Sequence, residues 1–558
     1  MDTYRAFVAI IISFVILLGY QYLFVGFGNK SQAPVEQTKE QPAVVSTDKK
    51  ADTAPALTAP QAEPTGAAVP VRTDRPAREI TVETDLYKAV LTEDGGAIKS
   101  FVLKEHAESI AKDSPGKELV KTTADQGWPL KFSWGSAAPA GLLYAGDAQE
   151  VVFGKDGKAV LTMKASAGNG LEIERRFSFD TKSYLIDLTV KVANTSNQPL
   201  QGIAQLHQVN SPFEGGDNAS SKFLFAGPSA FINGALHEVK AKEFADGAKT
   251  IQGKVEWAGY ASNYFLCGII PVADSGVSFT MQGTDAVTAT VVAGSLDTLQ
   301  PGQAKEYAYR VFYGPKKLTL LKELGFNLDK AVNFGWFDII AKPTLWLLNF
   351  FYGFCRNYGI AIILVTVLFK AVFWPITQKG MKSMKNMQKL QPKMVKIKEK
   401  YKDDPARMNQ EVMSLYKTYK VNPLGGCLPM VLQIPIFFAL YKVLLQCIEL
   451  RHAPFMLWIT DLSAPDRLWI GFDLPYLGGL PVLTLLMGAS MFLQQKLTPT
   501  TADPTQAKIM MFLPVVFTFM FLNFASGLVL YWFVNNLLAI LQQYMINRTS
   551  KPVPEKAR

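Results

Sequence analysis

The sequence contains few of the residues that form metal sites and disulfide frameworks. Only 4 cysteines and 4 histidines occur among 558 residues. The cysteines share no C-x-x-C or Cys/His ligand spacing, and three of them lie in or beside apolar stretches: Cys267, Cys355, Cys427 and Cys447. This distribution argues against a zinc site and against a set of disulfides. We therefore expect a protein without a metal or other cofactor.

Nucleotide-binding motifs are missing as well. The chain has no G-x-x-x-x-G-K-[ST] phosphate loop and no dinucleotide fingerprint. The sequence thus shows no means of hydrolysing ATP.

Long apolar runs are abundant instead. Hydrophobic residues make up 49% of the chain, with 36 phenylalanines, and most runs fall in its last 230 residues or so. This composition predicts a multi-pass α-helical membrane protein with a water-soluble insertion. The net charge of +10 could suggest nucleic acid, but its excess lies between Gln378 and Lys420, beside an apolar run. There the positive-inside rule explains it first.

The N-terminal part predicts an anchor and a tether. Residues 6–27 form an uncharged apolar run of 22 residues, long enough to span a bilayer. A cleavable signal peptide is the alternative, but the run is too long for a typical signal core and no A-x-A site follows closely. Residues 1–27 are therefore taken as a retained anchor. Residues 28–78 are rich in Pro and Ala without apolar periodicity, which predicts a disordered linker.

Residues 79–330 predict an antiparallel β-sandwich domain. Apolar residues alternate with polar ones from Leu171 to Phe179 and again from Tyr184 to Val192, with a short loop between them. Asp94-Gly95 signals another hairpin. Large sandwiches often bind sugars, but four candidate polar residues show no spacing that implies a mechanism, and structural or surface roles are expected for them: His207, His237, Glu214 and Asp217.

The predicted helical core begins with an aromatic segment at 331–356. Pro343 interrupts this segment, so we expect a helix lying in the outer membrane interface rather than a span. A turn at Asn357–Gly359 then leads into the span 360–377. This span contains Lys370, which costs on the order of 2.5–3.5 kcal/mol at mid-depth unless its ammonium meets water or a polar cavity.

Two interpretations of Lys370 compete. The Lys370 side chain could extend from within the span toward the cytoplasmic headgroups, or its ammonium could face a polar cavity inside the core. Thr366 lies one helical turn away on the same face, the neighbouring spans carry uncharged polar residues, and two spans are only 17 and 16 residues long. Short spans thin the bilayer around them. These features favour a wet, positively charged groove, whereas Lys442 near the outer end of its span is expected to reach the interface.

Residues 378–422 predict a cytoplasmic helical hairpin. They carry 12 Lys or Arg against 4 Asp or Glu. Methionines and other apolar residues recur every three or four positions, which predicts one apolar face, with a bend at Pro392 and a second helix that starts after Asp404. The neighbouring cationic face is a candidate docking surface for a polyanionic partner such as a ribosome, or for anionic lipids: Lys382, Lys385, Lys389, Lys393, Lys396 and Lys400.

Four further spans are predicted at 427–447, 476–495, 509–524 and 527–546, followed by a tail at 549–558. The loop 448–473 has only two strong cations, and the tail is basic. The positive-inside rule therefore places both termini in the cytoplasm and residues 28–330 outside, in the periplasm of a Gram-negative cell. The expected fold has six spans, five of them forming the core.

Several segments resemble the YidC-type membrane protein insertases, over about residues 331–548. They read VNPLGGCLPMVLQIPIFFALY (421–441), ELRHAPFMLWITDLSAPD (449–466), TADPTQAKIMMFLPVVF (501–517) and SGLVLYWFVNN (526–536). The anchor, linker and β domain resemble the Gram-negative branch of this family. The resemblance implies a five-span core with a hydrophilic groove open to the cytoplasm and the lipid. It implies no catalysis.

The same resemblance suggests the groove residues and the partners. The matching position of the family's usual groove arginine is Lys370, which keeps the charge but loses the five-donor fork. Thr366 and Tyr531 match positions that resemble the family's groove and client-contact sites. Three further residues of the apolar spans complete the predicted groove: Gln433, Trp532 and Asn535. Implied partners are nascent membrane proteins, the Sec translocon, the ribosome or signal-recognition machinery, and anionic lipids.

Two other classes of protein are weighed against an insertase. A secondary transporter would be expected to have repeated halves with matching broken helices, and no such symmetry is seen. A membrane-anchored sugar enzyme would place its function in the β domain.

Overall fold

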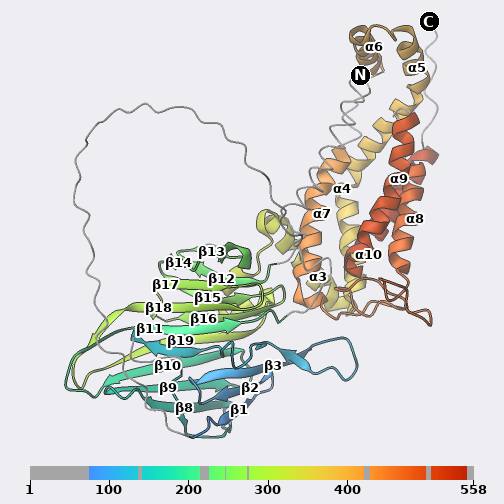
Figure 1. Cartoon of the computed structure of the whole chain (residues 1–558). Helices are drawn as coiled ribbons and strands as arrows, with labels where there is room; N and C mark the ends of the chain where they lie inside the picture. The colour runs from blue at the N-terminus through green and yellow to red at the C-terminus, as the bar shows by residue number, and fades with distance from the viewer. Residues whose placement is uncertain are drawn as a thin grey trace, which may run out of the picture. The chain divides into compact units, whose positions relative to one another are not determined.

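The computed structural model describes residues 75–135, 141–213, 225–244, 247–272, 275–419, 421, 428–497 and 504–549. They form a β domain followed by a helical core (Figure 1). The predicted anchor, residues 28–74 of the linker and the tail from residue 550 lie outside the described residues.

The described residues of the β domain form three sheets, in which neighbouring strands are often far apart in the chain. A five-stranded sheet has the order β4-β3-β2-β1-β7, with β4 Gly116–Glu118, β3 Ala97–Ala107, β2 Tyr87–Thr92, β1 Glu79–Glu83 and β7 Glu150–Val151. A nine-stranded sheet has the order β13-β12-β15-β16-β19-β10-β9-β8-β6, with β13 Ala235–Glu238, β12 Gly227–Ile232, β15 Val255–Ala261, β16 Phe265–Pro271, β19 Ala304–Pro315, β10 Leu185–Asn194, β9 Leu171–Asp180, β8 Lys158–Ser166 and β6 Ala145–Gly146. The third has the order β14-β17-β18-β11-β5, with β14 Lys249–Gln252, β17 Ser278–Gly283, β18 Thr288–Leu299, β11 Leu200–Asn210 and β5 Lys131–Trp134.

Both predicted hairpins are confirmed. β9 and β10 pair antiparallel, with Phe177 opposite Leu188. β2 and β3 pair antiparallel on either side of Asp94-Gly95. The alternation of apolar and polar residues predicted these strands correctly because successive side chains of a strand point to opposite faces. The apolar face of each strand therefore packs into the core. β1 and β7 pair in parallel, an exception to the expected antiparallel pattern.

A buried carboxylate ties the start of the domain to its first sheet. The Glu93 side chain has no solvent exposure, and its oxygens lie 2.5 Å from Arg75 Nη1 and 2.6 Å from Arg78 Nη2. The backbone N–H of Gly146 donates to Glu93 Oε1 at 3.0 Å. Burial alone would raise the pKa of Glu93, but the bonds from Arg78, Arg75 and the backbone outweigh it and lower this pKa to about 2.

Because this pKa is lower in the folded state than the ordinary value of 4.5, Glu93 stabilises the fold above pH 4.5. That contribution is lost as the pH falls toward 2. We expect Glu93→Gln to lower the thermal stability of the β domain most at neutral pH, with the gap to wild type closing between about pH 4.5 and 2. Near-UV circular dichroism across this pH range measures the gap.

Glu79→Gln is the matched control for this prediction. Glu79 pairs with Lys99 at the surface, and its side chain is 52% exposed, so its loss should change stability little at any pH. A gap between Glu93→Gln and wild type that stayed constant from pH 7 to 2 would contradict the assigned role.

The helical core follows after α2 (Leu318–Leu324) and short 3-10 turns at Leu328–Ala331 and Gly335–Phe337. Its helices are α3 Asp338–Cys355, α4 Tyr358–Lys389, α5 Gln391–Lys400, α6 Pro405–Thr418, α7 Leu428–Gln446, α8 Val482–Leu497, α9 Pro504–Phe521 and α10 Ser526–Thr549. In Figure 1, α4, α7, α8, α9 and α10 run side by side, with α3 at one end of this group and α5 and α6 at the other.

Four helices differ from their predictions. α9 begins at Pro504 and ends at Phe521, whereas the predicted span was 509–524. α3 continues through Pro343, where the Thr344 hydroxyl donates to the Ile340 carbonyl at 2.7 Å, so the expected interruption is wrong. α4 continues without a break from the predicted span into the hairpin, and the chain bends at Leu390 rather than at Pro392. α8 begins at Val482 instead of residue 476, because the segment from 476 to 481 is held in a loop.

The predicted turn before α4 and the cap of α6 are confirmed. Arg356 has a left-handed backbone, with φ of 52°, and the Asn357 side chain accepts a hydrogen bond from the Ile360 N–H at 3.1 Å. The Asp404 side chain likewise accepts from the Arg407 N–H at 3.0 Å, and Pro405 opens the helix.

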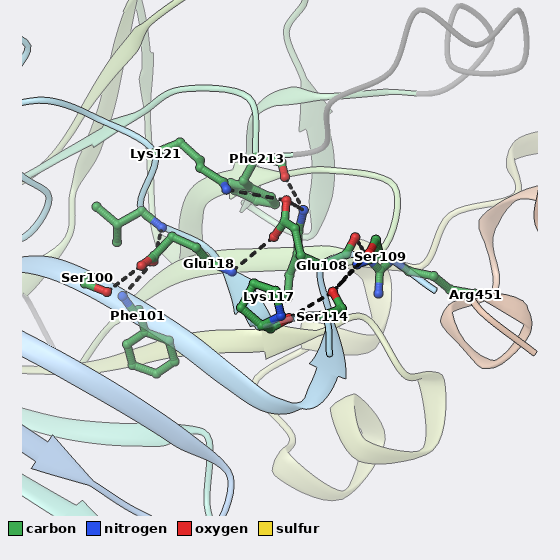
Figure 2. A network of polar contacts seen from close by, with 12 residues as sticks. Ser100, Phe101, Glu108, Ser109, Ser114, Lys117, Glu118, Lys121, Phe213 and Arg451 are labelled. Carbon is green, nitrogen blue, oxygen red and sulfur yellow. Dashed lines mark hydrogen bonds and ion pairs between the residues drawn. The ribbon is translucent and has the colours of Figure 1, made fainter. Parts of the chain in front are cut away.

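The β domain contacts the core at the end of α7. Asn263 donates to the carbonyl of Leu445 at 2.7 Å. Arg451 donates to the carbonyl of Glu108 at 3.2 Å (Figure 2), and it also lies over the ring of Phe265. The nearly buried Lys117 lies 3.0 Å from the Glu108 carboxylate and also donates to the Phe213 carbonyl. Burial would raise the pKa of Glu108, but Lys117 and Lys121 lower it below its ordinary value.

Candidate functional site

A cavity opens between α4, α7 and α10. Including the part open to solvent, it measures about 410 Å³. The residues that line it are Thr366, Phe369, Lys370, Phe373, Thr377, Gln433, Ile436, Tyr531 and Asn535. The five from α4 lie three, four, seven and eleven positions after the first of them, Thr366, so they share one face of that helix. Polar groups from three helices therefore converge on one concave surface with aromatic walls.

Lys370 supplies the charge of this cavity. Its side chain is half-buried on α4. None of the helices α4, α7, α8, α9 and α10 contains an Asp or Glu. Among the described residues, no hydrogen bond or ion pair reaches the Lys370 ammonium. A cation without a counter-charge in a partly dry site attracts an anionic group more strongly than the same cation in bulk water.

The other polar groups of the cavity are held by their own helices or by neighbours. The Thr366 hydroxyl donates to the Ile362 carbonyl at 2.7 Å, and the Thr377 hydroxyl donates to the Phe373 carbonyl at 3.0 Å. Gln542 of α10 donates to Thr377 Oγ1 at 2.9 Å, which ties α10 to α4 beside the cavity. Threonines satisfied in this way can line an intramembrane cavity without a desolvation penalty.

Five of the six predicted groove residues line this cavity: Thr366, Lys370, Gln433, Tyr531 and Asn535. Trp532 does not. Its ring packs against Phe437, Phe517 and Phe521, at centroid distances of 5.2, 6.0 and 5.3 Å. It follows Tyr531 directly on α10, and adjacent helical residues point about 100° apart.

The sequence interpretation did not include Phe369, Phe373, Thr377 and Ile436. Helical spacing could have found three of them, because Phe369, Phe373 and Thr377 lie three, seven and eleven positions after Thr366. Thr377 had been taken only as the end of a span.

The six hairpin lysines fall into two groups. Lys385 is half-buried and lies 3.4 and 3.2 Å from the carbonyls of Ile546 and Asn547, the last turn of α10. It thus complements the negative end of that helix. Lys393 donates to the Tyr419 hydroxyl of the second hairpin helix. The exposed side chains of the set are Lys382, Lys389, Lys393, Lys396 and Lys400.

The apolar stripes of the hairpin pack on one another. Met387, Leu390 and Val421 are buried together, with Leu415 and Tyr416 against them. The Tyr416 hydroxyl lies 3.0 Å from the Met394 sulfur. The predicted antiparallel packing is confirmed at these positions, and it leaves the cationic face in solvent.

The surfaces of the core helices are strongly apolar. Two described helices, Tyr358–Lys389 and Ser526–Arg548, are long and apolar enough to cross a membrane by length and composition, and two shorter apolar helices lie at Gln433–Gln446 and Met510–Phe521. On α9 alone, exposed apolar side chains include Phe512 at 63% and Phe519 at 70%. So large an exposed apolar surface is typical of contact with lipid.

Of the four polar residues singled out in the β domain, the two described ones lie on strands of different sheets. His207 of β11 lies 2.7 Å from the Ser133 hydroxyl, and burial lowers its pKa. His237 lies on β13, opposite Ala230 of β12. Glu214 and Asp217 lie outside the described residues. Among the described residues, no group of three or more His, Cys, Asp or Glu is placed to hold a metal ion.

Comparison with known proteins places the chain. Residues 350–553 match the family model described as 60Kd inner membrane protein, and residues 79–347 match the YidC periplasmic domain. The membrane protein insertase YidC of Syntrophus aciditrophicus is 42% identical over 98% of this chain and 99% of its own length. That of Geotalea daltonii is 41% identical, again over 98% and 99%. The solved structure of YidC from Thermotoga maritima is 15% identical, covers 86% of this chain and 99% of that chain, and has a TM-score of 0.30.

These matches define an inner-membrane protein with a periplasmic β-rich domain and a helical core. The chain belongs to the YidC family of membrane protein insertases. It is therefore an insertase that acts on nascent membrane proteins, not an enzyme, and the resemblance seen in the sequence is confirmed. The transporter and sugar-enzyme alternatives are rejected by the same matches.

Proposed function

We propose that client proteins enter the membrane through the cavity between α4, α7 and α10, which serves as a client groove. The observation that carries this proposal is the convergence of Thr366, Lys370, Gln433, Tyr531 and Asn535 on one surface. Lys370 attracts acidic groups of the client's short polar segment, and the uncharged polar groups replace part of its hydration. The client's apolar segment meanwhile passes along the lipid-facing side of the core.

The driving force is burial of about 20 apolar client residues in the bilayer, and no covalent step is needed. The protein lowers the barrier for the polar end. The two spans predicted to be short belong to longer helices, since α4 has 32 residues and α9 has 18. The described part of α8 has 16 residues, about 24 Å of helix at about 1.5 Å per residue, against a hydrocarbon core of about 30 Å. A bilayer thinned around such a helix shortens the path that the polar segment must travel.

The proposed topology has six spans, with both termini in the cytoplasm and residues 28–330 in the periplasm. It rests on the predicted anchor, the helices described above and the positive-inside rule. The exposed lysines of the hairpin then face the cytoplasm. There they would receive a ribosome or the signal-recognition machinery, or bind anionic lipids, and the core would work alone or beside the Sec translocon.

A crosslinking experiment tests the path. Asn535→Cys places a thiol on the cavity, while Leu537→Cys places one two residues away on α10, where the side chain is 45% exposed and is not among the lining residues. Each variant is reconstituted in liposomes and given a two-span client with one cysteine in its polar loop. We expect a short bismaleimide to trap the client at residue 535 during insertion, several-fold more than at 537. Equal trapping at both positions would contradict a path through the cavity.

A further inference from the structure

The segment between α7 and α8 ends in a closed loop with an apolar surface. Leu468 and Leu480 exchange backbone hydrogen bonds of 2.8 Å, which closes residues 469–479 into a tip. We call these residues the aromatic tip. Its exposed apolar side chains are Trp469 at 69%, Ile470 at 41%, Phe472 at 61% and Tyr476 at 104%. Asp473 is the one charged residue among the eleven.

The tip is mounted rigidly on the core. The Leu468–Leu480 pair forms the neck of the tip. Next to it, Arg467 donates to the Leu522 carbonyl at 2.8 Å and to Asn523 Oδ1 at 2.9 Å, just past the end of α9. Asp466 accepts from the Trp458 indole at 2.6 Å and from the Leu483 N–H at 2.5 Å, which caps α8. The exposed side chains therefore stand on a braced loop, not on a loose one.

The backbone of the tip is also shaped to present its side chains outward. Tyr476 has a φ of 64°, in the left-handed region that bulky residues rarely adopt. Its side chain is the most exposed of the tip. Leu457, in the same interhelical segment, combines a φ of 57° with 83% exposure. Backbone conformations of this kind persist only where the surrounding structure holds them, and they cluster at functional surfaces.

The tip lies at the end of the bundle where α3 lies. Asn357, between α3 and α4, donates to the Phe455 carbonyl of the α7–α8 segment at 2.8 Å, and Gly359 packs against the Phe455 ring. Figure 1 shows α3 and this segment at the same end of α4, α7 and α10. α3 and the 3-10 turn before it present further exposed aromatic side chains there: Trp346, Phe350 and Phe354 on α3, and Trp336 in the turn.

We infer that the aromatic tip inserts into the headgroup region of the bilayer and anchors the α8–α10 side of the core there, at the same end of the bundle as α3. Tryptophan and tyrosine concentrate at this depth because each has an apolar ring and one polar group. Lipid is the partner that we infer for the tip, because its apolar surface continues into that of α8, which exposes Leu485, Leu486 and Phe492. The single charge of the tip leaves little to recognise a polar protein surface.

Fluorescence depth measurements test this inference on the full chain in phosphatidylethanolamine and phosphatidylglycerol liposomes. Cys355 and Cys427 are replaced by serine, and the buried Cys267 and Cys447 stay unlabelled. An environment-sensitive dye is attached to one new cysteine at a time, at Trp469, Phe472 or Tyr476. Phe512→Cys on α9 serves as the lipid-exposed reference and Lys112→Cys on the β domain as the water-exposed one.

At the three tip positions we expect blue-shifted emission, with quenching by a lipid spin-labelled near its headgroup at least twofold stronger than at Lys112→Cys. Aqueous iodide should quench them at least twofold less than it quenches Lys112→Cys. In a Trp469→Ser/Phe472→Ser background, the dye at residue 476 should move to water, whereas Trp469→Tyr should keep it in lipid. These exposed substitutions leave the buried neck intact, so folding is preserved. Iodide quenching at the tip equal to that at Lys112→Cys would overturn the inference.

Discussion

A Lys370→Glu protein is expected to insert clients with an acidic polar loop about a hundredfold more slowly than wild type. Two unit charges about 6 Å apart at an effective dielectric constant of about 20 interact by roughly 3 kcal/mol. Water in the open groove screens about half of this, which leaves on the order of 1.4 kcal/mol, or tenfold in rate. Removing the charge loses that attraction, and reversing it adds a repulsion of similar size.

A series of substitutions at this position makes the prediction quantitative. Lys370→Arg should insert at close to the wild-type rate, Lys370→Gln about tenfold more slowly, and Lys370→Glu about a hundredfold more slowly. A client with a neutral loop should be affected several-fold less by each. The measurement is the initial rate of client insertion into inverted membrane vesicles that contain each variant at the same level.

Lys442→Gln is the matched control, because this lysine lies on α7 but is not among the residues that line the cavity. Its loss should leave insertion within about twofold of wild type. Full-rate insertion of acidic clients by Lys370→Glu would remove the electrostatic part of the mechanism and return Lys370 to the headgroup interpretation.

The second large effect is expected in the β domain, at Arg175. This side chain is completely buried on β9. Its Nη1 donates to the carbonyls of Gly95 and Gly96 at 2.7 and 2.8 Å, and its Nη2 donates to the carbonyl of Leu130 at 2.7 Å. The guanidinium also lies 5.0 Å from the centre of the Phe177 ring. It thus joins the β2–β3 turn to the strand that follows residue 130.

Arg175→Met should lower the free energy of unfolding of the β domain by about 3–5 kcal/mol. Three buried carbonyls lose their donor, and each unsatisfied group costs about 1–3 kcal/mol, partly offset because the arginine no longer has to be desolvated. Urea unfolding of the full chain in detergent, followed by near-UV circular dichroism, measures the loss.

Arg176→Met is the control on the same strand. Arg176 points to the other face, is 60% exposed and pairs with Glu174 at 3.3 Å, so its loss should cost less than about 1 kcal/mol. Equal destabilisation by the two substitutions would contradict a special role for Arg175.

Arg175 also shows where sequence reasoning stops. Leu171, Ile173, Phe177 and Phe179 define the inward face of β9, and position 175 belongs to the same series. From the sequence alone, an arginine at this position contradicts an apolar inward face. Its burial is explained by three carbonyl acceptors that come from segments distant in the chain.

The groove was predictable because its signal is local. Lys370 stands out in an apolar run, and Thr366 shares its face at helical spacing. Tyr531 came from resemblance to the family, which carries the packing of distant helices that no single helix encodes. Gln433 and Asn535 stood out as uncharged polar residues in apolar spans. Trp532 shows the limit, since its contacts with Phe437, Phe517 and Phe521 depend on how α10 is rotated against α7 and α9.

Boundaries and partners of surface charges were harder to predict. The expected start of a span at residue 476 followed hydrophobicity, whereas the chain uses Tyr476 in the aromatic tip and begins α8 only where Asp466 can cap it. Lys385 belonged by periodicity to a docking face, yet it lies against the last carbonyls of α10. In each case a contact from elsewhere in the chain decides the outcome.

The most direct test of the client groove is a charge exchange in liposomes that hold only this protein, scored by protease protection of a two-span client. Wild type should protect an acidic-loop client above empty liposomes, and Lys370→Glu should protect it poorly. Lys370→Glu should then recover protection when the acidic residues of the client loop are changed to lysine, while wild type loses it. If wild type and Lys370→Glu protected the acidic-loop client equally, and the lysine-loop client equally, the proposal that this cavity receives the client would be contradicted.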